Sequence, residues 1–325
     1  MEQARPVNYS ISCVIPAFNE GDEITEFLHE LHEMLHTFAE RVEIIVVNDG
    51  SRDHTAAAVA AIAESLALTL LDLSRNFGKE AAITAGLARV RGDVVLIIDA
   101  DGQEPLSTIG PMLERWRDGC DMVYAVRDGR ADERWLKRMG AGFFYSLLTR
   151  GGETPIPPDA RDFRVMDRRV VDALNRLPER NRFMKGLFAW VGFKTCAVPV
   201  KIDVRKGGRS AFGFSQLSRL ALTGITSFTK VPLRIWGAIG VVISLLAFAY
   251  GTYIALRTLF FGVDIPGFAT LAVSIMFFAG IQLISIGVIG EYLSRVFDEV
   301  KQRPVYLVAD ELDHSPLREP GPPAP

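Results

Sequence analysis

The stretch Val94-Val-Leu-Ile-Ile-Asp99-Ala-Asp101-Gly-Gln103-Glu-Pro105 decides the fold, because a short apolar run breaks off into two carboxylates spaced one residue apart. The run is rich in β-branched residues and apolar on both faces, which predicts a central parallel strand with helices on both sides. Asp99 then lies at the carboxyl end of that strand, where open α/β sheets bind their ligands. The expected fold class is α/β.

The two aspartates predict a metal site. Residues i and i+2 of an extended backbone point the same way, so Asp99 and Asp101 can share one cation and Gln103 can add a third oxygen. Oxygen ligands of this kind suit Mg²⁺ or Mn²⁺, and a hard divalent cation at a sheet edge can carry a nucleotide diphosphate. Paired acids after a strand are also typical of a solvated turn, so the interpretation depends on the motifs around them.

Strand-like and helical patterns alternate along the first part of the chain, which predicts a mostly parallel sheet. The expected strands are Ile11–Ile15, Glu43–Asn48, Leu68–Leu73, Val94–Asp99 and Asp121–Val126, and the expected helices are Asp22–Glu40, Thr55–Ser65, Lys79–Arg89 and Leu106–Arg117. The next segments read as a helix over 132–149, a Gly/Pro-rich break over 151–158, a strand over 162–166, a helix over 182–190 and a strand over 197–204.

Two long segments, Ile235–Leu256 and Phe268–Gly290, contain no charged residue. Each meets the requirement of about 20 apolar residues for a membrane-spanning helix, and buried core helices of a soluble domain seldom run so long without a charge. The segment 217–231 has the pattern of an interfacial amphipathic helix leading into the hairpin. The small residues Gly237, Gly240, Gly280, Gly287 and Gly290 suit packing against a second copy, and hence a homo-oligomer.

Flanking charge sets the expected orientation and boundaries. Lysines and arginines precede the first apolar segment and follow the second, so both termini should face the cytoplasm of a bacterial inner membrane, with the protein multi-pass. The expected divisions are a cytoplasmic domain over 1–212, the amphipathic helix over 213–232, the membrane hairpin over 233–292, and a C-terminal segment over 293–325 that is disordered from Ser315 onward. The N-terminus lacks the apolar core of a signal peptide.

Charge and cysteine content narrow the function further. The formal net charge of −3 argues against a nucleic-acid partner, because such domains are usually markedly basic. Cys13, Cys120 and Cys196 are scattered and fit no metal-ligand spacing, which agrees with a reducing compartment and predicts no disulfide. His29, His32 and His36 flank the apolar stripe of a surface helix, where solvated side chains are the expected interpretation.

Three more strand ends carry polar motifs at the sheet edge of Asp99. They are Val14-Ile-Pro16-Ala17-Phe-Asn19-Glu20, Val46-Val-Asn48-Asp49-Gly50-Ser51 and Ser74-Arg75-Asn76-Phe77-Gly78-Lys79-Glu80. The last gives two cations and a glycine at a helix entrance, which suits a diphosphate. No Walker loop occurs, and the dinucleotide fingerprint is missing. The sequence therefore favours nucleotide-sugar binding over ATP hydrolysis or hydride transfer.

Together, Val14–Glu20, Val46–Thr55, Ser74–Gly86 and Asp99–Pro105 resemble glycosyltransferase family 2. From about Ile11 to Arg303 the chain looks like the polyprenyl-phosphate branch, with its dolichol-phosphate mannosyltransferases, bactoprenol glucosyltransferases and undecaprenyl-phosphate aminoarabinose transferases. The resemblance implies a GT-A-like fold. It also implies transfer, with inversion, of one sugar from a UDP- or GDP-linked donor to a polyprenyl phosphate.

The resemblance also implies roles for individual residues. Pro16, Ala17, Glu20, Asp49, Lys79 and Arg205 are expected to bind the nucleotide sugar; Asp99, Asp101 and Gln103 the metal; and Arg127 and Arg138 the lipid phosphate, with Asp99, Asp101 and Asp162 as the catalytic acids. The loop 205–212 matches the family's R-x-x-G-x-S-K-Y except that Ala211 and Phe212 replace the lysine and the tyrosine.

Two other functions remain open from the sequence. The same fold can transfer a sugar to a hydroxylated lipid such as diacylglycerol, a reaction that needs a general base. A non-catalytic membrane scaffold that retains the fold is the third interpretation. The paired acids argue against the scaffold, which has no use for two carboxylates on one ion.

Overall fold

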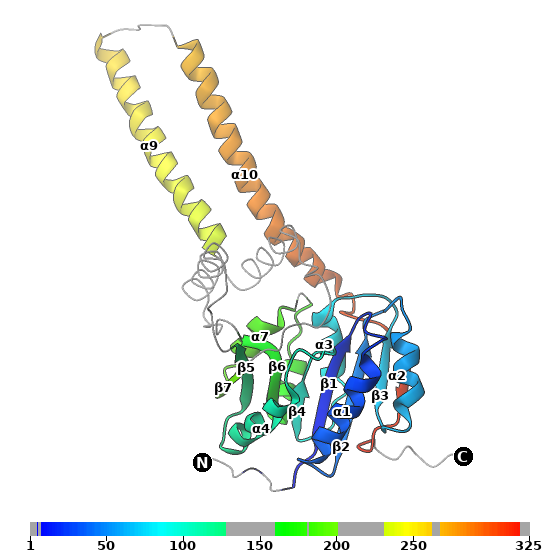
Figure 1. Cartoon of the computed structure of the whole chain (residues 1–325). Coiled ribbons are helices and arrows are strands. Elements are labelled where there is room, and N and C mark those ends of the chain that lie inside the picture. The colour runs from blue at the N-terminus through cyan, green and yellow to red at the C-terminus, as the bar shows by residue number, and fades with distance from the viewer. Residues whose placement is uncertain are drawn as a thin grey trace.

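A computed structural model describes residue 5 and residues 8–127, 160–180, 182–200, 231–261 and 267–318. It consists of an α/β domain and two long helices that extend together from one end of it (Figure 1). The helix expected over 132–149, the break over 151–158 and all but the last residue of the amphipathic helix over 217–231 lie outside the described residues. So do Arg138 and the loop that contains Arg205.

The described strands form one eight-stranded sheet in the order β7-β5-β6-β4-β1-β2-β3-β8. Strand β1 pairs parallel with β2 and β4, β2 with β3, and β5 with β7, whereas β6 and β8 run antiparallel to their neighbours. The mostly parallel sheet is thus confirmed. The bounds are β1 Ile11–Ala17, β2 Val42–Asn48, β3 Thr69–Leu73, β4 Val94–Ile97, β5 Met122–Arg127, β6 Ala160–Asp167, β7 Thr195–Val200 and β8 Val308–Asp313.

Helices cover both faces of this sheet, as its two-sided apolar strands predict. Alternate residues of β4 divide between two cores: Val94 and Leu96 pack on one face, Val95 and Ile97 on the other. The first core includes side chains of α1 (Ile24–His36), α2 (Thr55–Ala63) and α4 (Ile109–Arg117), the last preceded by a 3₁₀ turn over Leu106–Thr108. The second includes α3 (Lys79–Leu87), α6 (Arg168–Asn175) and α7 (Met184–Trp190).

The two long helices are α9 (Val231–Phe261) and α10 (Phe268–Lys301). The stretches Ile239–Phe261 and Val273–Lys301 are long and apolar enough to cross a membrane. In the described part of the chain, no residue of the most apolar part of either stretch is buried. This exposure contradicts the alternative of core helices in a soluble domain. Length, composition and exposure together fit a helical hairpin (Figure 1).

The C-terminal segment returns to the α/β domain. Strand β8 pairs antiparallel with β3, and Ser315 and Leu317 beyond it are buried. The expected disorder from Ser315 onward is therefore wrong for residues 315–318, while residues 319–325 lie outside the described ones. A domain boundary at residue 212 likewise leaves out one strand of the sheet. Polar residues facing solvent on this edge strand hide it from a search for apolar runs.

Cys120 and Cys196 form a disulfide with their Cα atoms 6.0 Å apart, so the expectation of no disulfide is wrong. Cys120 precedes β5 and Cys196 lies in β7, which pairs in parallel with β5. The two cysteines are 76 residues apart in sequence, and only the sheet order brings them together. Cys13 is buried and free.

Candidate active site

A cavity of about 260 Å³ opens at the carboxyl edge of the sheet. The segments that follow β1, β2, β3 and β4 all contribute to its wall. The lining residues are Pro16, Ala17, Phe18, Glu20, Asp49, Asn76, Gly78, Lys79, Ala82, Asp99, Ala100 and Asp101. The structure therefore brings together seven of the residues selected from sequence, from four separate motifs, as the carboxyl ends of parallel strands require.

Asp49 fixes the turn between β3 and α3. Its carboxylate accepts the backbone N–H of Phe77 at 2.7 Å and of Gly78 at 2.9 Å. Burial raises the pKa of Asp49, and these two hydrogen bonds offset part of that effect. Gly50 has a φ of +62°, and a Cβ there would lie 2.3 Å from the carbonyl carbon of Arg75, so close approach of the two turns needs glycine. One further lone pair on each Asp49 oxygen can still accept from a ligand.

The turn after β1 is held to the turn after β2 by backbone and side-chain hydrogen bonds. The N–H of Asn19 donates to Ser51 Oγ at 3.0 Å, and that of Glu20 donates to Thr55 Oγ1 at 3.0 Å. Asn19 has the left-handed φ of 57°, which asparagine tolerates better than most residues. The wall that carries Pro16, Ala17 and Glu20 is thus pre-organised by the neighbouring motif.

Lys79 joins two acids of the site. Its Nζ lies 2.7 Å from each oxygen of Asp99, donating to Oδ2, and 2.8 Å from Oδ2 of Asp162. Burial alone would lower the pKa of Lys79, but the charges of Asp162 and Asp99 outweigh it and raise that pKa. In this structure Lys79 therefore pairs with carboxylates, whereas the sequence suggested only a contact with the diphosphate.

Asp99 and Asp162 respond differently to this shared lysine. Burial raises the pKa of Asp99, and the charge of Lys79 only partly compensates because Asp162 and Asp101 are nearby. Burial would also raise the pKa of Asp162, but Lys79 and Lys185 hold it below its ordinary value. Asp162 is consequently the more firmly ionised of the two.

The acids after β4 fit a divalent metal. One carboxylate oxygen from each of Asp99, Asp101 and Glu104 lies within 4.8 Å of the others. Oε2 of Glu104 is buried and accepts no hydrogen bond from any described residue, whereas Oδ1 of Asp99 lies 2.7 Å from Nζ of Lys79. Buried carboxylate oxygens without donors are costly unless a cation satisfies them. Hard oxygen ligands of this kind match Mg²⁺ or Mn²⁺.

The third acid of this cluster is Glu104, whereas the sequence predicts Gln103 as the third oxygen ligand. The i, i+2 spacing selects Gln103, but Gly102 adopts a φ of 61°, so the backbone is not extended there. The N–H of Gln103 donates to Oδ1 of Asp101 at 3.2 Å and shapes the turn. Glu104 is present in the sequence motif, but the turn at Gly102 is what brings its carboxylate near those of Asp99 and Asp101.

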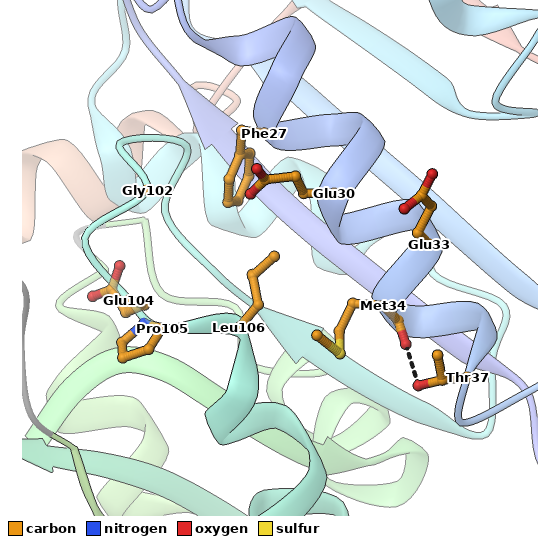
Figure 2. A pocket seen from close by; sticks show the side chains of 9 residues that line it. All are labelled: Phe27, Glu30, Glu33, Met34, Thr37, Gly102, Glu104, Pro105 and Leu106. Carbon is orange, nitrogen blue, oxygen red and sulfur yellow. Dashed lines mark hydrogen bonds between the residues drawn. The ribbon is translucent and has the colours of Figure 1, made fainter.

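Glu104 also links the metal-site loop to β6. Its Oε1 accepts from Nε of Arg161 at 2.9 Å, and Arg161 adjoins Asp162. Burial raises the pKa of Glu104 to about 7, with a further contribution from Asp99. A second cavity, of about 570 Å³, lies between this loop and α1, where Figure 2 shows Glu104 and Pro105 across from Glu30 and Glu33. No cation lines that cavity among the described residues, so it does not resemble a diphosphate site.

Two more buried charged residues, Arg164 and Glu80, interact electrostatically with Asp162. The Arg164 guanidinium, 2% exposed, stacks 3.7 Å from the ring centre of Phe188, and burial lowers its pKa to about 10. Glu80 accepts the N–H of Met184 at 3.2 Å, and burial together with the charge of Asp162 raises its pKa to about 7. Neither residue is selected from sequence, although Glu80 follows Lys79 in a quoted motif.

The expected acceptor residues are only partly placed. Arg127 is the last residue of β5, in register with Val200 of β7, and nothing is described of its side chain. Arg138 and Arg205 lie outside the described residues. The assignment of these three arginines to substrate phosphates stays a prediction.

A mostly parallel sheet with helices on both faces and an acidic cavity at its carboxyl edge is the arrangement of a GT-A-like domain. The profile of the family Glycosyl transferase family 2 matches residues 12–174. The chain belongs to glycosyl transferase family 2. The resemblance noted from the sequence is thereby confirmed, and the protein is a glycosyltransferase.

Similar proteins match almost the whole chain. A protein of Synechocystis sp. named an uncharacterized glycosyltransferase is 46% identical over 312 residues, covering 95% of this chain and 98% of that one. The SfII prophage-derived bactoprenol glucosyl transferase of Shigella flexneri is 44% identical and covers 92% of this chain and 97% of its own. The prophage bactoprenol glucosyl transferase homolog of Escherichia coli K12 is also 44% identical, covering 92% and 98%.

Proposed function

We propose that this glycosyltransferase moves one sugar from a UDP- or GDP-linked donor to the phosphate of a polyprenol such as undecaprenyl phosphate, inverting the anomeric carbon. The observation that carries the proposal is the meeting of Asp99, Asp101 and Glu104 with Lys79 and Asp162 at one sheet edge. Relatives named bactoprenol glucosyl transferase, matched over most of the chain, support the lipid acceptor.

Mg²⁺ or Mn²⁺ would be held by Asp99 and Asp101, with Glu104 and Gln103 as the candidates for a further ligand. When bound, the metal supplies positive charge against the negative charge that builds on the departing diphosphate. The buried Oε2 of Glu104, which has no hydrogen-bond donor among the described residues, supports this assignment.

The chain's own residues position the donor. Asp49 offers acceptor lone pairs to a base N–H, and the turns carrying Pro16, Ala17 and Glu20 form the opposite wall of the cavity. Lys79 is placed to change partners, because a donor diphosphate entering the cavity brings new negative charge within reach of its ammonium group. Most of the acceleration is then expected from fixed orientation of the two substrates.

In the reaction, an oxygen of the acceptor phosphate forms a bond to the anomeric carbon, and the bond from that carbon to the nucleoside diphosphate breaks. The electron pair leaves with the diphosphate. A phosphate is already anionic at neutral pH, so no strong base is needed. Asp162 pairs with Lys79 at 2.8 Å, and we propose that it orients that lysine and the acceptor.

The helical hairpin would place this chemistry at the membrane. We propose that α9 and α10 span the bacterial inner membrane and hold the α/β domain on the cytoplasmic side, where nucleotide sugars are available. Lys301 and Arg303 follow the uncharged segment Phe268–Gly290, in agreement with the positive-inside rule. Anchoring raises the effective concentration of the catalyst near its lipid.

The test is to incubate membranes containing the full chain with a panel of labelled UDP- and GDP-sugars and to extract the lipids. We expect one donor to give a labelled lipid whose sugar is released by mild acid, as a glycosyl phosphate ester is. A labelled lipid that resists mild acid would favour the diacylglycerol alternative. Absence of any labelled lipid with every donor, beside an active positive-control membrane, would contradict the proposal and leave the scaffold interpretation.

A further inference from the structure

The carboxyl-terminal end of α10 does not hang free of the α/β domain. The N–H of Arg180 donates to Oε2 of Glu299 at 3.1 Å, and Nη1 of Arg180 donates to the carbonyl oxygen of Arg303 at 2.8 Å. Figure 1 shows the end of this helix entering the domain beside α3. The second apolar helix is therefore joined to the domain on the side where α3 begins.

A cavity of about 390 Å³ lies at this junction, and we call it the junction cavity. It is walled by the start of α3, by the segment before α7 and by the end of α10 with the residues that follow it. Its lining residues are Phe77, Glu80, Ala81, Arg180, Arg182, Asp298, Lys301, Arg303, Pro304 and Val305. Four of these side chains are cationic and two are acidic.

The cations of the junction cavity have acids nearby but form no carboxylate ion pairs among the described residues: the charge of Glu179 acts on Arg182, and Glu299 accepts from the backbone N–H of Arg180. None of the four forms an ion pair with an acid in the described part of the chain. Arg182 donates to the carbonyl oxygens of Leu174 and Leu177 at 3.1 and 2.7 Å, while its Nη1 is buried without a hydrogen-bond partner there. Lys301 lies 3.9 Å from the ring centre of Phe297.

The two acids do not cancel this charge. Glu80 accepts the N–H of Met184, and burial raises its pKa to about 7, so near neutral pH it carries only part of a charge. Asp298 is exposed and makes no ion pair with the described residues. Converging cations without ion-pair partners among the described residues favour an anion that brings its own oxygens, since charged hydrogen bonds of this kind are strong.

The position of the junction cavity indicates where that anion comes from. The apolar stretch of α10 runs from Val273, and the cavity is lined by residues of its last turn and by those that follow. If Phe268–Gly290 spans the membrane, the last turn of α10 lies about 16 Å along the helix axis beyond Gly290, at the cytoplasmic surface of the headgroup layer. Basic residues directly next to a span bind anionic lipids there.

We propose that the junction cavity binds the phosphate of an anionic membrane phospholipid. The bound headgroup would join the end of α10 to the start of α3 and so set the orientation of the catalytic domain to the bilayer. Lys79 lies between Phe77 and Glu80 in sequence, so the same short segment lines this cavity and the active-site cavity. The inference depends on the membrane placement in the proposed function, but not on the donor, the metal or the acceptor.

The test uses the full chain in a neutral detergent, with thermal unfolding followed as lipid is added. Phosphatidylglycerol is expected to raise the unfolding temperature saturably, while phosphatidylcholine leaves it unchanged. The double variant Lys301→Gln/Arg303→Gln removes two cations whose side chains make no ion pair with the described residues, so it should fold. Losing about 1 kcal/mol per cation predicts about 30-fold weaker binding of phosphatidylglycerol.

The matched control is Arg41→Gln/Arg115→Gln, which removes two exposed cations, one just before β2 and one in α4. Both elements lie at the end of the domain remote from α9 and α10 (Figure 1). It should respond to phosphatidylglycerol like the parent chain. An unchanged response of the junction variant, or an equal response to phosphatidylcholine, would overturn the proposal. Inorganic phosphate that saturates the shift and abolishes the lipid's effect would overturn the lipid assignment in favour of a free anion.

Failure of this inference can be told apart from failure of the proposed function. Extraction of membranes with alkaline carbonate tests the membrane placement: release of the chain would remove the basis of both proposals. A chain that stays in the membrane, binds nucleotide sugar and ignores phosphatidylglycerol would overturn the junction site alone. Nucleotide-sugar binding by Lys301→Gln/Arg303→Gln is expected to match the parent chain.

Discussion

Two buried glutamates, one at the amino edge and one at the carboxyl edge of the sheet, differ in how fully their carboxylates are hydrogen-bonded. Glu43, fully buried on β2, accepts from Ser12 Oγ at 2.6 Å, from Nη1 of Arg91 at 2.9 Å and from Ser315 Oγ at 2.7 Å. Glu104, 4% exposed, accepts from Arg161 through one oxygen, and its other oxygen has no donor among the described residues. The first carboxylate is satisfied by the fold, whereas the second is left incomplete.

The difference separates a buried carboxylate that stabilises the fold from one whose remaining oxygen is left for a ligand. Buried charge is expensive unless it is paired, so an incomplete shell persists where a ligand completes it. At the amino edge, Arg91 and Ser315 join β8 to the sheet and serve stability. At the carboxyl edge, Asp99, Glu104 and Glu80 have raised pKa values, which is the electrostatic cost of a site prepared for a cation and an anionic substrate.

The largest effect is expected at the carboxyl edge, from Asp101→Ala. Loss of one metal ligand should lower the rate of sugar transfer by about 10²–10³-fold, the range found when one group that stabilises developing charge is removed. The unfolding temperature should hardly change, because Asp101 makes no ion pair with the described residues. Transfer rates across a Mg²⁺ or Mn²⁺ titration measure this, with Asp118→Ala as the exposed control. Full activity of Asp101→Ala in the presence of a chelator would contradict the metal assignment.

A substitution at the amino edge should have the reverse effect: it should lower the free energy of unfolding and leave nucleotide-sugar binding unchanged. Glu43→Gln removes the charge that faces Arg91 and weakens the bonds to Ser12 and Ser315, which predicts a loss of about 2–3 kcal/mol in the free energy of unfolding. Denaturant unfolding of the full chain in detergent measures this. Glu64→Gln, on an exposed residue after α2, should be neutral. If Glu43→Gln unfolds like Glu64→Gln, the network at this edge contributes nothing.

The same glutamate-to-glutamine change should stabilise the protein at Glu80. Burial raises its pKa from 4.5 to about 7, so the folded protein binds a proton that the unfolded chain has lost. Stability is then full below about pH 4.5 and declines as the pH rises through 7. Glu80→Gln keeps an acceptor for the N–H of Met184 and removes this decline. We expect equal stability of the two chains at pH 4.5 and a gain on the order of 1–3 kcal/mol for the variant at pH 8.

Unfolding at several pH values measures the effect of Glu80→Gln. Its control is Glu114→Gln, an exposed glutamate of α4, which should follow the parent chain at every pH. A gain that is the same at pH 4.5 and pH 8 would mean that packing, and not the charge of Glu80, is responsible.

The comparison also shows what the sequence could and could not predict. Central strands such as Val94–Ile97 can be predicted from the sequence because both of their faces are apolar. The four motifs that follow such strands lie at one edge because the strands are parallel. Strand β8 could not be predicted, because the polar contacts that hold it are distant in sequence. Arg91 donates to both Glu43 and Asp313, which are 270 positions apart. The disulfide could not be predicted for the same reason: the order of β5 and β7 in the sheet cannot be read from spacing.

Within the site, the residue types were predictable and their partners were not. The aspartates of the metal cluster follow from spacing, but the choice between Gln103 and Glu104 depends on the left-handed Gly102. Lys79 reads as a phosphate ligand until the structure shows it between Asp99 and Asp162. Local pattern therefore predicts which groups reach the edge, and packing decides which of them meet.

The smallest effect is expected from Asp162→Asn, and it separates the two candidate acceptors. Lys79 and Lys185 hold the pKa of Asp162 below its ordinary value in the ligand-free chain, and a phosphate acceptor needs no strong base. If it only orients Lys79 and the acceptor, the isosteric amide should lower kcat by about tenfold and leave the shape of the pH–rate profile near neutrality unchanged. A base for a hydroxyl acceptor would instead be lost entirely, with a fall of about 10²–10⁴-fold. A modest loss with either lipid phosphate or an analogue of it supports the phosphate acceptor, whereas near-complete loss would return diacylglycerol-type acceptors to first place.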